Sequence, residues 1–501
     1  MRLCCQPIVD AWERARPFVS PGLGGPHSTP RCYFLPVTEV PGRLRFEHEH
    51  VTTDQERYEA GREARKTLPR SAHAEYRPHP DRDPLGVLDR QHANRMPHLV
   101  PLRVERMLQD PFGFYRGTAA LQAADLAGEP ITGEGVAICG DAHIGNFGLF
   151  ASAEQSLVFD LNDFDEAAFG PWEWDLKRLV TSAVIAARHR GSTAETAADH
   201  ARTAARAYRD GLRAALKRDG VERFFRTTAV HKNRSIFGKE TQKVINAAIR
   251  ATEKRTSARA LEKITQVMPD GSRQLIEDPP RLVHLEPEWE ERVSDVFEAY
   301  RASVPPNVAL LLRQHTITDV ARLVTGVGSV GMRCHLFVLT GPQGEPLLLQ
   351  LKQAAESVVQ EFGNAPYAIS LGVDPELMKA NPSYRVASSQ RILQAASDPF
   401  LGWLTMDGFS YYVRQFRNRS VSFDTDTMTE NTFDDYVTAC AMALSYAHSR
   451  SPNGAFISGY IGRGDPLIDA VVAWAEAYAD QSLADFEALR KAAASGRYDI
   501  A

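Results

Sequence analysis

The sequence predicts an α+β protein with a small antiparallel β lobe and a large helical lobe. Three observations lead to this fold class. Residues 53–120 and the chain after Asp175 carry apolar residues at helical spacing, and the second of these stretches is rich in alanine. From about Thr316 the spacing changes to the alternation of β-strands, interrupted by glycine turns. Between these regions, residues 136–176 combine short apolar runs with loops of carboxylates and amides.

Composition limits the classes of protein to consider. The chain has 501 residues, of which 43% are hydrophobic and 24% charged, so it can bury large cores. Its net charge of -5 gives no general electrostatic reason to expect nucleic acid or an anionic membrane as a partner. The six cysteines include no CxxC pair, and no run approaches 18 apolar residues. We therefore expect a cytoplasmic protein with no zinc site, disulfide framework or membrane span. These patterns do not determine its oligomeric state.

The chain divides into five expected segments. Residues 1–50 are rich in proline and glycine, which predicts a loose extension, and residues 51–130 form a helical N-terminal region. Residues 131–315 are expected to form a helical lobe that carries the polar loops. Residues 316–420 form a β-rich lobe, and residues 421–501 are helices that return to the helical lobe.

The stretch from Val136 to Leu176 holds the candidate functional residues. VAIC predicts a buried strand, and the loop after it carries Asp141, His143 and Asn146. A second strand and an acidic loop follow, with Asp160, Asn162, Asp163, Asp165 and Glu166. We expect these runs to deliver the carboxylates and amides to one end of a sheet. Such oxygen-rich loops indicate a site for a metal ion and phosphate.

A glycine-rich turn lies in the predicted β lobe. The sequence GVGSVG contains Gly326, Gly328, Ser329 and Gly331, and the alternating stretch MRCHLFVL follows it. A dinucleotide-binding fold requires a helix directly after such glycines, so the context argues against that fold. It favours a flap between two antiparallel strands that covers the phosphates of a nucleotide. Lys352, on the third strand, is in the position of a phosphate-binding lysine.

Several motifs together resemble known families. CGDAHIGN is similar to the HGDxHxxN loop of aminoglycoside-phosphotransferase-like kinases, and DFDEAAFGPWEWDL resembles their metal loop. With FGFYRG, QRILQAASDPFLGW and YYVRQFRNRS, these motifs resemble the DUF2252 family over roughly residues 55–460. The kinase resemblance implies a two-lobed protein-kinase-like fold that uses ATP and Mg²⁺ to phosphorylate an unknown hydroxyl-bearing acceptor. The DUF2252 resemblance by itself implies no reaction.

The kinase resemblance also implies roles for the loop residues. Asp141 corresponds to the base or acceptor-orienting carboxylate, and Asn146 to a metal ligand from the same loop. Asp163 corresponds to the principal metal ligand, with Asp165 or Asp160 as additional ligands. In the β lobe, Lys352 is expected to bind the α- and β-phosphates under the flap formed by Gly326, Gly328, Ser329 and Gly331.

Four nearby residues complete the expected site. Asp175 is expected to cap the loop of Asp141 from the start of a helix, and His143 to hydrogen-bond within that loop. Cys139 is expected to pack, because nothing near it in the sequence indicates an activating base. Arg116 has two readings: it meets the acidic loops or a phosphate, or it is a surface arginine stacked on Tyr115.

The acidic partner of Lys352 is open at this stage. Glu356 and Glu361 are candidates in the helix after the lysine. A further position, two residues before the pair Gln390 and Arg391, is often acidic in the family but is Ser388 in this chain. If Ser388 is the partner position, the protein is a nucleotide-binding pseudokinase scaffold without catalysis. Nucleotidyl transfer, in which AMP is moved, is the alternative reaction.

The order of these motifs is unusual for a kinase. The glycine flap follows the loop of Asp141 by about 180 residues, whereas in kinases it precedes that loop. DDYVTACAMALSYAHSRS, near the C-terminus, resembles the helix that normally leads into the loop. Residues 53–126 show no strand alternation, which argues against an ordinary N-terminal β lobe there. We therefore predict a circularly permuted kinase-like fold.

Overall fold

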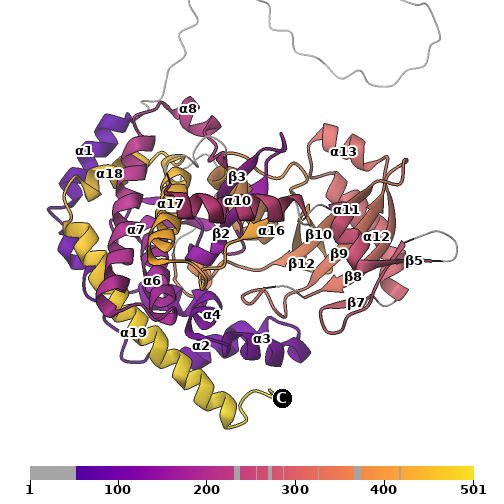
Figure 1. The fold of residues 1–501 in the computed structure, drawn as a ribbon, viewed down its shortest axis with the longest axis horizontal. Helices are drawn as coiled ribbons and strands as arrows, with labels where there is room; N and C mark the ends of the chain where they lie inside the picture. Colours follow the sequence, from indigo (N-terminus) through magenta and orange to yellow (C-terminus); the bar gives the residue numbers. More distant parts are fainter. Residues whose placement is uncertain are drawn as a thin grey trace, which may run out of the picture. The chain divides into compact units, whose positions relative to one another are not determined.

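The computed structural model describes residues 52–230, 237–254, 257–268, 273–285, 287–324, 326–365, 374–416 and 419–500. The expected loose extension, residues 1–50, lies outside the described residues. The described residues form an α+β arrangement in which most helices gather on one side and one larger antiparallel sheet forms the other (Figure 1). The predicted fold class is therefore confirmed at the level of a mixed α+β protein with small antiparallel sheets.

Helices dominate the described residues on both sides of the central stretch, residues 136–176. Those that form the helical part are α1 (Asp54–Ala64), α2 (Pro84–Ala93), α3 (Val100–Met107), α4 (Pro111–Arg116), α5 (Ala119–Leu126), α6 (Trp172–His189), α7 (Ala194–Ala215), α8 (Gly220–Phe225), α10 (Lys239–Glu253), α17 (Glu430–Ser449), α18 (Gly454–Ile461) and α19 (Pro466–Ala494). Among the described helices, none is both long enough and apolar enough to cross a membrane.

Helix α6 is the centre of the helical part. Sixteen of its residues, from Trp172 to Ala187, are buried, because α7, α17 and α19 pack around it. Small residues permit this close packing: Ala197, Ala201 and Ala204 of α7 are buried at helical spacing and face the same core. Helices from both ends of the described chain therefore share one hydrophobic core.

The larger sheet carries the second part of the molecule. Its described strands lie in the order β11 (Gly402–Met406), β12 (Phe409–Gln415), β10 (Pro346–Ala354), β9 (Cys334–Thr340), β8 (Thr316–Leu323) and β7 (Leu282–His284), and all neighbours are antiparallel. As expected, the glycine turn joins the antiparallel strands β8 and β9, and Lys352 lies on the third strand, β10. Strand β7 adds to the sheet from outside the expected segment 316–420.

Both faces of this sheet are covered. The helices α12 (Pro287–Arg301) and α13 (Pro306–Leu312) pack with Phe337, Leu349 and Leu351 in one apolar cluster. Helix α11 (Ser257–Ile264) and the hairpin of β5 (Thr265–Val267) and β6 (Arg273–Leu275) pack with Leu336 and Leu348 in another. The remaining helices, α14 (Val358–Glu361), α15 (Pro375–Ala380) and α16 (Pro382–Leu393), follow β10.

The central stretch forms two small sheets, where the sequence suggested one. Strand β1 (Gly135–Ile138) pairs with β4 (Ala168–Pro171), whereas β2 (Phe147–Ala151) pairs with β3 (Leu157–Leu161) and β13 (Val421–Ser422). The chain leaves one sheet for the other after Ile138 and returns before Ala168. The connection from β1 to β2 carries Asp141 and Asn146, and the connection from β3 to β4 carries Asp163 and Asp165. These two connections lie beside each other because both cross between the same two sheets, which the alternation of apolar residues does not predict.

Asp175, in the first turn of α6, fixes the first of these crossings. Its carboxylate accepts hydrogen bonds from the backbone N–H groups of Cys139, at 2.6 Å, and Gly140, at 2.9 Å. His448 of α17 lies 3.1 Å from the same carboxylate through Nε2, and its Nδ1 is 2.7 Å from the Tyr208 hydroxyl. The expected structural role of Asp175 agrees with these bonds.

Replacing Asp175 with alanine should destabilise the protein. The change leaves two buried N–H groups without an acceptor, so we expect the free energy of unfolding to fall by about 3 kcal/mol. Urea unfolding followed by circular dichroism measures this change. Asp480→Ala is the control, because the Asp480 side chain is 73% exposed and its ion pair with Arg188 should contribute less than about 1 kcal/mol. Equal losses in the two variants would contradict the anchoring role.

Candidate functional site

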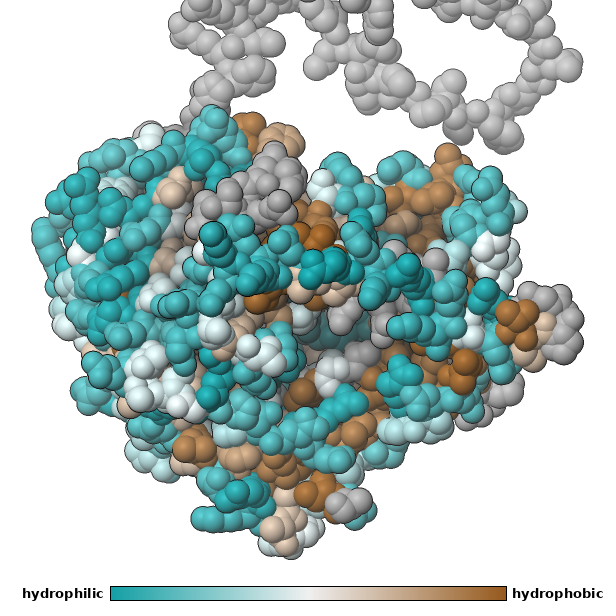
Figure 2. Space-filling model, viewed as in Figure 1, coloured by the Kyte–Doolittle hydropathy of each residue, from teal (hydrophilic) through white to brown (hydrophobic). Residues whose placement is uncertain are grey.

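The predicted site residues gather around one cleft. It has a volume of about 290 Å³ and lies where three segments meet: the polar loop (residues 139–146), the acidic loop (residues 162–167) and the glycine loop (residues 326–332). Seven predicted residues line it, namely Asp141, Asn146, Asp163, Asp165, Gly326, Gly328 and Ser329. On the face seen in Figure 2, the surface is hollowed between the helical part and the larger sheet, with hydrophilic residues at several points of the rim.

Gly140 sets the direction of the polar loop. Its φ is +73°, a left-handed conformation that glycine adopts without strain, and a Cβ here would lie 2.1 Å from the carbonyl oxygen of Glu166. The polar and acidic loops therefore touch through backbone at this point. The close contact brings the next residue, Asp141, to the edge of the cleft.

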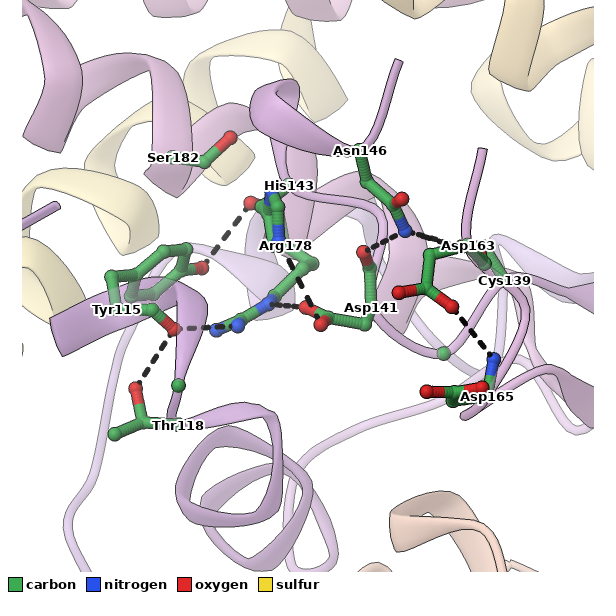
Figure 3. Close-up of polar contacts among 12 residues, drawn as sticks. Tyr115, Thr118, Cys139, Asp141, His143, Asn146, Asp163, Asp165, Arg178 and Ser182 are labelled. Atoms are coloured by element: carbon green, nitrogen blue, oxygen red, sulfur yellow. Dashed lines mark hydrogen bonds and ion pairs between the residues drawn. The ribbon is translucent and has the colours of Figure 1, made fainter. Parts of the chain in front are cut away.

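Asp141 is held by an arginine that the sequence analysis did not identify. The Arg178 Nε donates to Asp141 Oδ1 at 2.8 Å, and the guanidinium lies 3.9 Å from the centre of the Tyr115 ring (Figure 3). Arg178 also donates to the Tyr115 carbonyl at 2.7 Å and to Gln122 at 2.9 Å. Burial raises the pKa of Asp141, and Arg178 acts in the opposite direction by stabilising the carboxylate. The carboxylate is thus fixed in one orientation.

His143 is unsuited to act as a base in this structure. Burial, Arg116 and Arg178 hold the pKa of His143 well below its usual value, so the imidazole is neutral at pH 7. Its Nε2 lies 3.7 Å from Asp141 Oδ2, and its backbone carbonyl accepts from the Asn146 N–H at 2.8 Å. The hydrogen bond within the loop therefore comes from the backbone of His143.

Asn146 connects the polar and acidic loops. Its Nδ2 donates to the carbonyl oxygens of Asp141 and Asp163, each at 3.1 Å (Figure 3). Because these bonds occupy the amide nitrogen, Oδ1 is the side-chain atom left to bind a cation. The Cys139 sulfur lies 3.5 Å from the Nδ2 of Asn146. Burial raises the pKa of the Cys139 thiol well above its usual value. Cys139 therefore packs, as expected.

Lys352 joins the larger sheet to the acidic loop. Its side chain is 3% exposed, and its Nζ forms an ion pair with Asp165 and lies 3.9 Å from Asp163 Oδ2. Tyr412, opposite Lys352 across strands β10 and β12, donates its hydroxyl to Asp165 at 2.7 Å. Burial opposes the charge on the ammonium, but Asp163 and Asp165 prevail and raise the pKa of Lys352. The lysine is therefore charged and fixed behind the cleft.

A second arginine, Arg385 of α16, supports the acidic loop. Its guanidinium donates to the carbonyl oxygens of Ala167, Asp165 and Ala355, the last two at 2.8 Å. These bonds connect α16, the acidic loop and the end of β10. Neither Glu356 nor Glu361 is the residue that Lys352 contacts, although both line the cleft. Ser388 is partly exposed on α16.

The helical N-terminal region holds the glycine loop. The N–H of Met96 donates to the Gly331 carbonyl at 2.8 Å, Arg95 donates to the Val330 carbonyl, and Arg106 donates to the Gly326 carbonyl. A Cβ on Gly331 would lie 2.9 Å from that of Arg95, so the close approach requires glycine. The helical N-terminal region thus holds the glycine loop in place and borders the cleft through Arg95.

Asp160 lies apart from the other predicted ligands. It is opposite Gly148 in the β2–β3 pairing, and its carboxylate accepts from the Leu161 N–H at 2.9 Å. Burial raises the pKa of this carboxyl to about 6, against a smaller opposite effect of Arg450. Asp160 is not among the described residues that line the cleft.

Two of the predicted metal ligands are placed to bind a cation in the cleft. Among the residues that the structure describes, no three His, Cys, Asp or Glu side chains converge on one point. Asp163 exposes 45% of its side chain, and the Asn146 amide bonds to its backbone carbonyl, whereas Asp165 is engaged by Lys352 and Tyr412. Of the predicted metal ligands that line the cleft, the Asp163 carboxylate and Asn146 Oδ1 are therefore available. This set suits a cation that completes its coordination with water and phosphate oxygens.

Comparison with known proteins assigns the chain to a family. No curated protein and no solved structure matches it. The model of the family described as "Uncharacterized protein conserved in bacteria (DUF2252)" matches residues 95–492, which include all the cleft-lining residues except Gln91 and Asn94. On this match, the chain belongs to the DUF2252 family.

Proposed function

We propose that this protein is an ATP- and Mg²⁺-dependent phosphotransferase with a circularly permuted, kinase-like fold, and that its acceptor bears a hydroxyl group. The observation that carries the proposal is the meeting of distant segments at one cleft. Asp141 and Asp163 come from the first third of the chain, whereas the glycine loop lies more than 150 residues later, and Lys352 lies directly behind the cleft in an ion pair with Asp165. These are the groups that phosphoryl transfer requires: an orienting carboxylate, metal ligands and a phosphate-binding cation.

The available ligands fit Mg²⁺. This ion is commonly held by one or two carboxylates together with waters and substrate phosphates, and in the cleft Asp163 and Asn146 Oδ1 would hold it. When bound, Mg²⁺ would neutralise charge on the phosphates. Asp165 would supply a second carboxylate only after leaving Lys352 and Tyr412, because both contacts occupy its oxygens.

The proposed reaction assigns Asp141 a defined part. The acceptor hydroxyl oxygen bonds to the γ-phosphorus of ATP, and the bond from this phosphorus to the β,γ-bridging oxygen breaks. The electron pair stays with the ADP oxygen, and the hydroxyl proton passes to Asp141. Burial raises the pKa of Asp141, which makes its carboxylate a better proton acceptor, and Arg178 keeps it oriented.

Contacts between the C-terminal helices and β1 support the permuted order. The Ala137 N–H donates to Ser451 Oγ at 3.0 Å, and Asn453 Nδ2 donates to the Gly135 carbonyl at 2.9 Å. The end of α17 therefore lies against the start of the strand that leads to Asp141. In the unpermuted order that the kinase resemblance implies, the chain would run directly from this helix into that loop.

We also propose that the protein is cytoplasmic. The described cysteines Cys139, Cys334 and Cys440 are free and buried, which suits a reducing compartment where ATP is available.

Nucleotide binding is the first consequence to test. Mg²⁺ and ATP should raise the midpoint of thermal unfolding, since a ligand at 100 times its Kd stabilises the folded state by about 2.7 kcal/mol. Lys352→Met should abolish most of this rise, measured against the variant's own midpoint without nucleotide. EDTA should reduce the rise in the unsubstituted protein.

Lys66→Met is the matched control, because Lys66 is a lysine outside the cleft with 76% of its side chain exposed. It should retain the full nucleotide-dependent rise. A chain whose midpoint responds to no nucleotide in the presence of Mg²⁺ would refute the proposal.

Labelled nucleotides identify the reaction. With γ-labelled ATP, label should pass to an acceptor in a bacterial small-molecule extract or, more slowly, to water, whereas label from α-labelled ATP should stay in nucleotide. Asp163→Ala should reduce the transfer at least about 100-fold, because a metal ligand and its charge are lost. Asp480→Ala should leave the transfer unchanged.

The alternatives give different results in this assay. Transfer of the α-label instead of the γ-label would indicate a nucleotidyltransferase. Binding without transfer of either label would indicate the pseudokinase scaffold, which the lack of an acid at Ser388 favours. Persistent labelling by Asp163→Ala would refute the metal assignment.

A further inference from the structure

Arg116 is a cationic residue of the cleft that the roles above leave unassigned. It is the last residue of α4, in the helical N-terminal region, and its half-buried side chain lines the cleft. The sequence allows two roles for it, and stacking on Tyr115 is not seen, because Arg178 is the arginine that lies over the Tyr115 ring. The contacts of its guanidinium group therefore indicate its function.

Arg116 differs from the other cations at the cleft in having no protein acceptor. Its Nε is buried without a hydrogen-bond partner, and among the described residues none forms an ion pair or hydrogen bond with its guanidinium. By contrast, Arg95 donates to the Val330 carbonyl, and Arg414 donates to Gln350 at 3.0 Å and to the Asn162 carbonyl at 3.3 Å. A buried N–H without an acceptor is costly, and a ligand in the cleft can supply the acceptor that the Arg116 Nε lacks.

The position of Arg116 lies between the two loops that would hold the phosphates. Its Nε lies 3.5 Å from the point where a Cβ on Gly145 would be, directly before Asn146. Its carbonyl oxygen lies 3.6 Å from the corresponding point on Gly328 in the glycine loop. Arg116 thus lies within contact distance of both the polar loop and the glycine loop.

From these contacts we infer that Arg116 binds the terminal phosphoryl group of ATP, an inference that rests on the proposed function. In that position its N–H groups donate to the oxygens of the γ-phosphate. These oxygens keep their negative charge while the acceptor oxygen bonds to the γ-phosphorus and the bond to the β,γ-bridging oxygen breaks. The electron pair leaves with ADP and the acceptor proton goes to Asp141. An arginine at this place stabilises the transition state as well as bound ATP.

Neighbouring residues strengthen this assignment. Lys352 is already engaged by Asp165, and Arg178 by Asp141. Arg116 is the described cation closest to Gly145 that remains available for a phosphate.

The test compares two nucleotides that differ in the terminal phosphate. Isothermal titration in Mg²⁺ measures the affinity of a non-hydrolysable ATP analogue and of ADP for the full chain. Arg116→Ala should weaken the analogue about 10- to 100-fold, as expected for lost charge-assisted hydrogen bonds, and change ADP less than about twofold. The rate of γ-label transfer should fall about 10³-fold. Arg116→Lys should recover part of both losses, since lysine restores the charge without the planar fork.

Arg62→Ala is the matched control, because Arg62 is exposed on α1 and does not line the cleft. It should leave both affinities and the rate unchanged. Equal weakening of the analogue and ADP by Arg116→Ala would show a merely structural role and overturn the inference. Unchanged binding of both nucleotides with lost transfer would assign Arg116 to the acceptor and also overturn it. In either case the proposed function stands. If the unsubstituted chain binds neither nucleotide, both the proposed function and the inference about Arg116 are refuted.

Discussion

The ion pair between Lys352 and the acidic loop is the interaction on which the cleft depends. Lys352 is almost wholly buried on β10, and a buried ammonium without a counter-charge is costly by several kcal/mol. Asp165, with Asp163 close by, supplies that charge from a loop almost 190 residues earlier in the chain. The sheet and the loop must therefore stay together. Tyr412 and Arg385 satisfy the remaining oxygens around Asp165, so the contact has one geometry.

A second constraint comes from the helical N-terminal region. Hydrogen bonds from Met96, Arg95 and Arg106 reach backbone carbonyls of the glycine loop, and a small apolar cluster of Leu99, Val324 and Val330 lies beneath them. A glycine turn between two strands would otherwise have few contacts to hold it. These contacts fix its distance from the polar loop, so opening the cleft at this side requires residues 95–106 to move with it.

The sequence predicts the loops of the site better than the residues that hold these loops in place. Short apolar runs and glycine turns identify the polar, acidic and glycine loops, because those patterns are local. Arg178 and Arg385 lie on helices whose local pattern is that of packed helices, and their function depends on which loop each helix meets. Asp160 shows the opposite case. It resembles its acidic neighbours in sequence, but it lies within β3 opposite Gly148 and does not line the cleft.

In the helical part, segments that lie far apart in the sequence are neighbours in space. Ser451 and Asn453 meet β1 through hydrogen bonds, where the proposed unpermuted chain would have a peptide link. Such non-covalent junctions need additional support, because closing a long loop costs more entropy than continuing a short one. Asp175 provides this support: one carboxylate receives the N–H groups of the polar loop and the His448 imidazole of α17. The polar loop therefore depends on a helix that arrives from the far end of the sequence, and its geometry is completed only when α17 docks against α6.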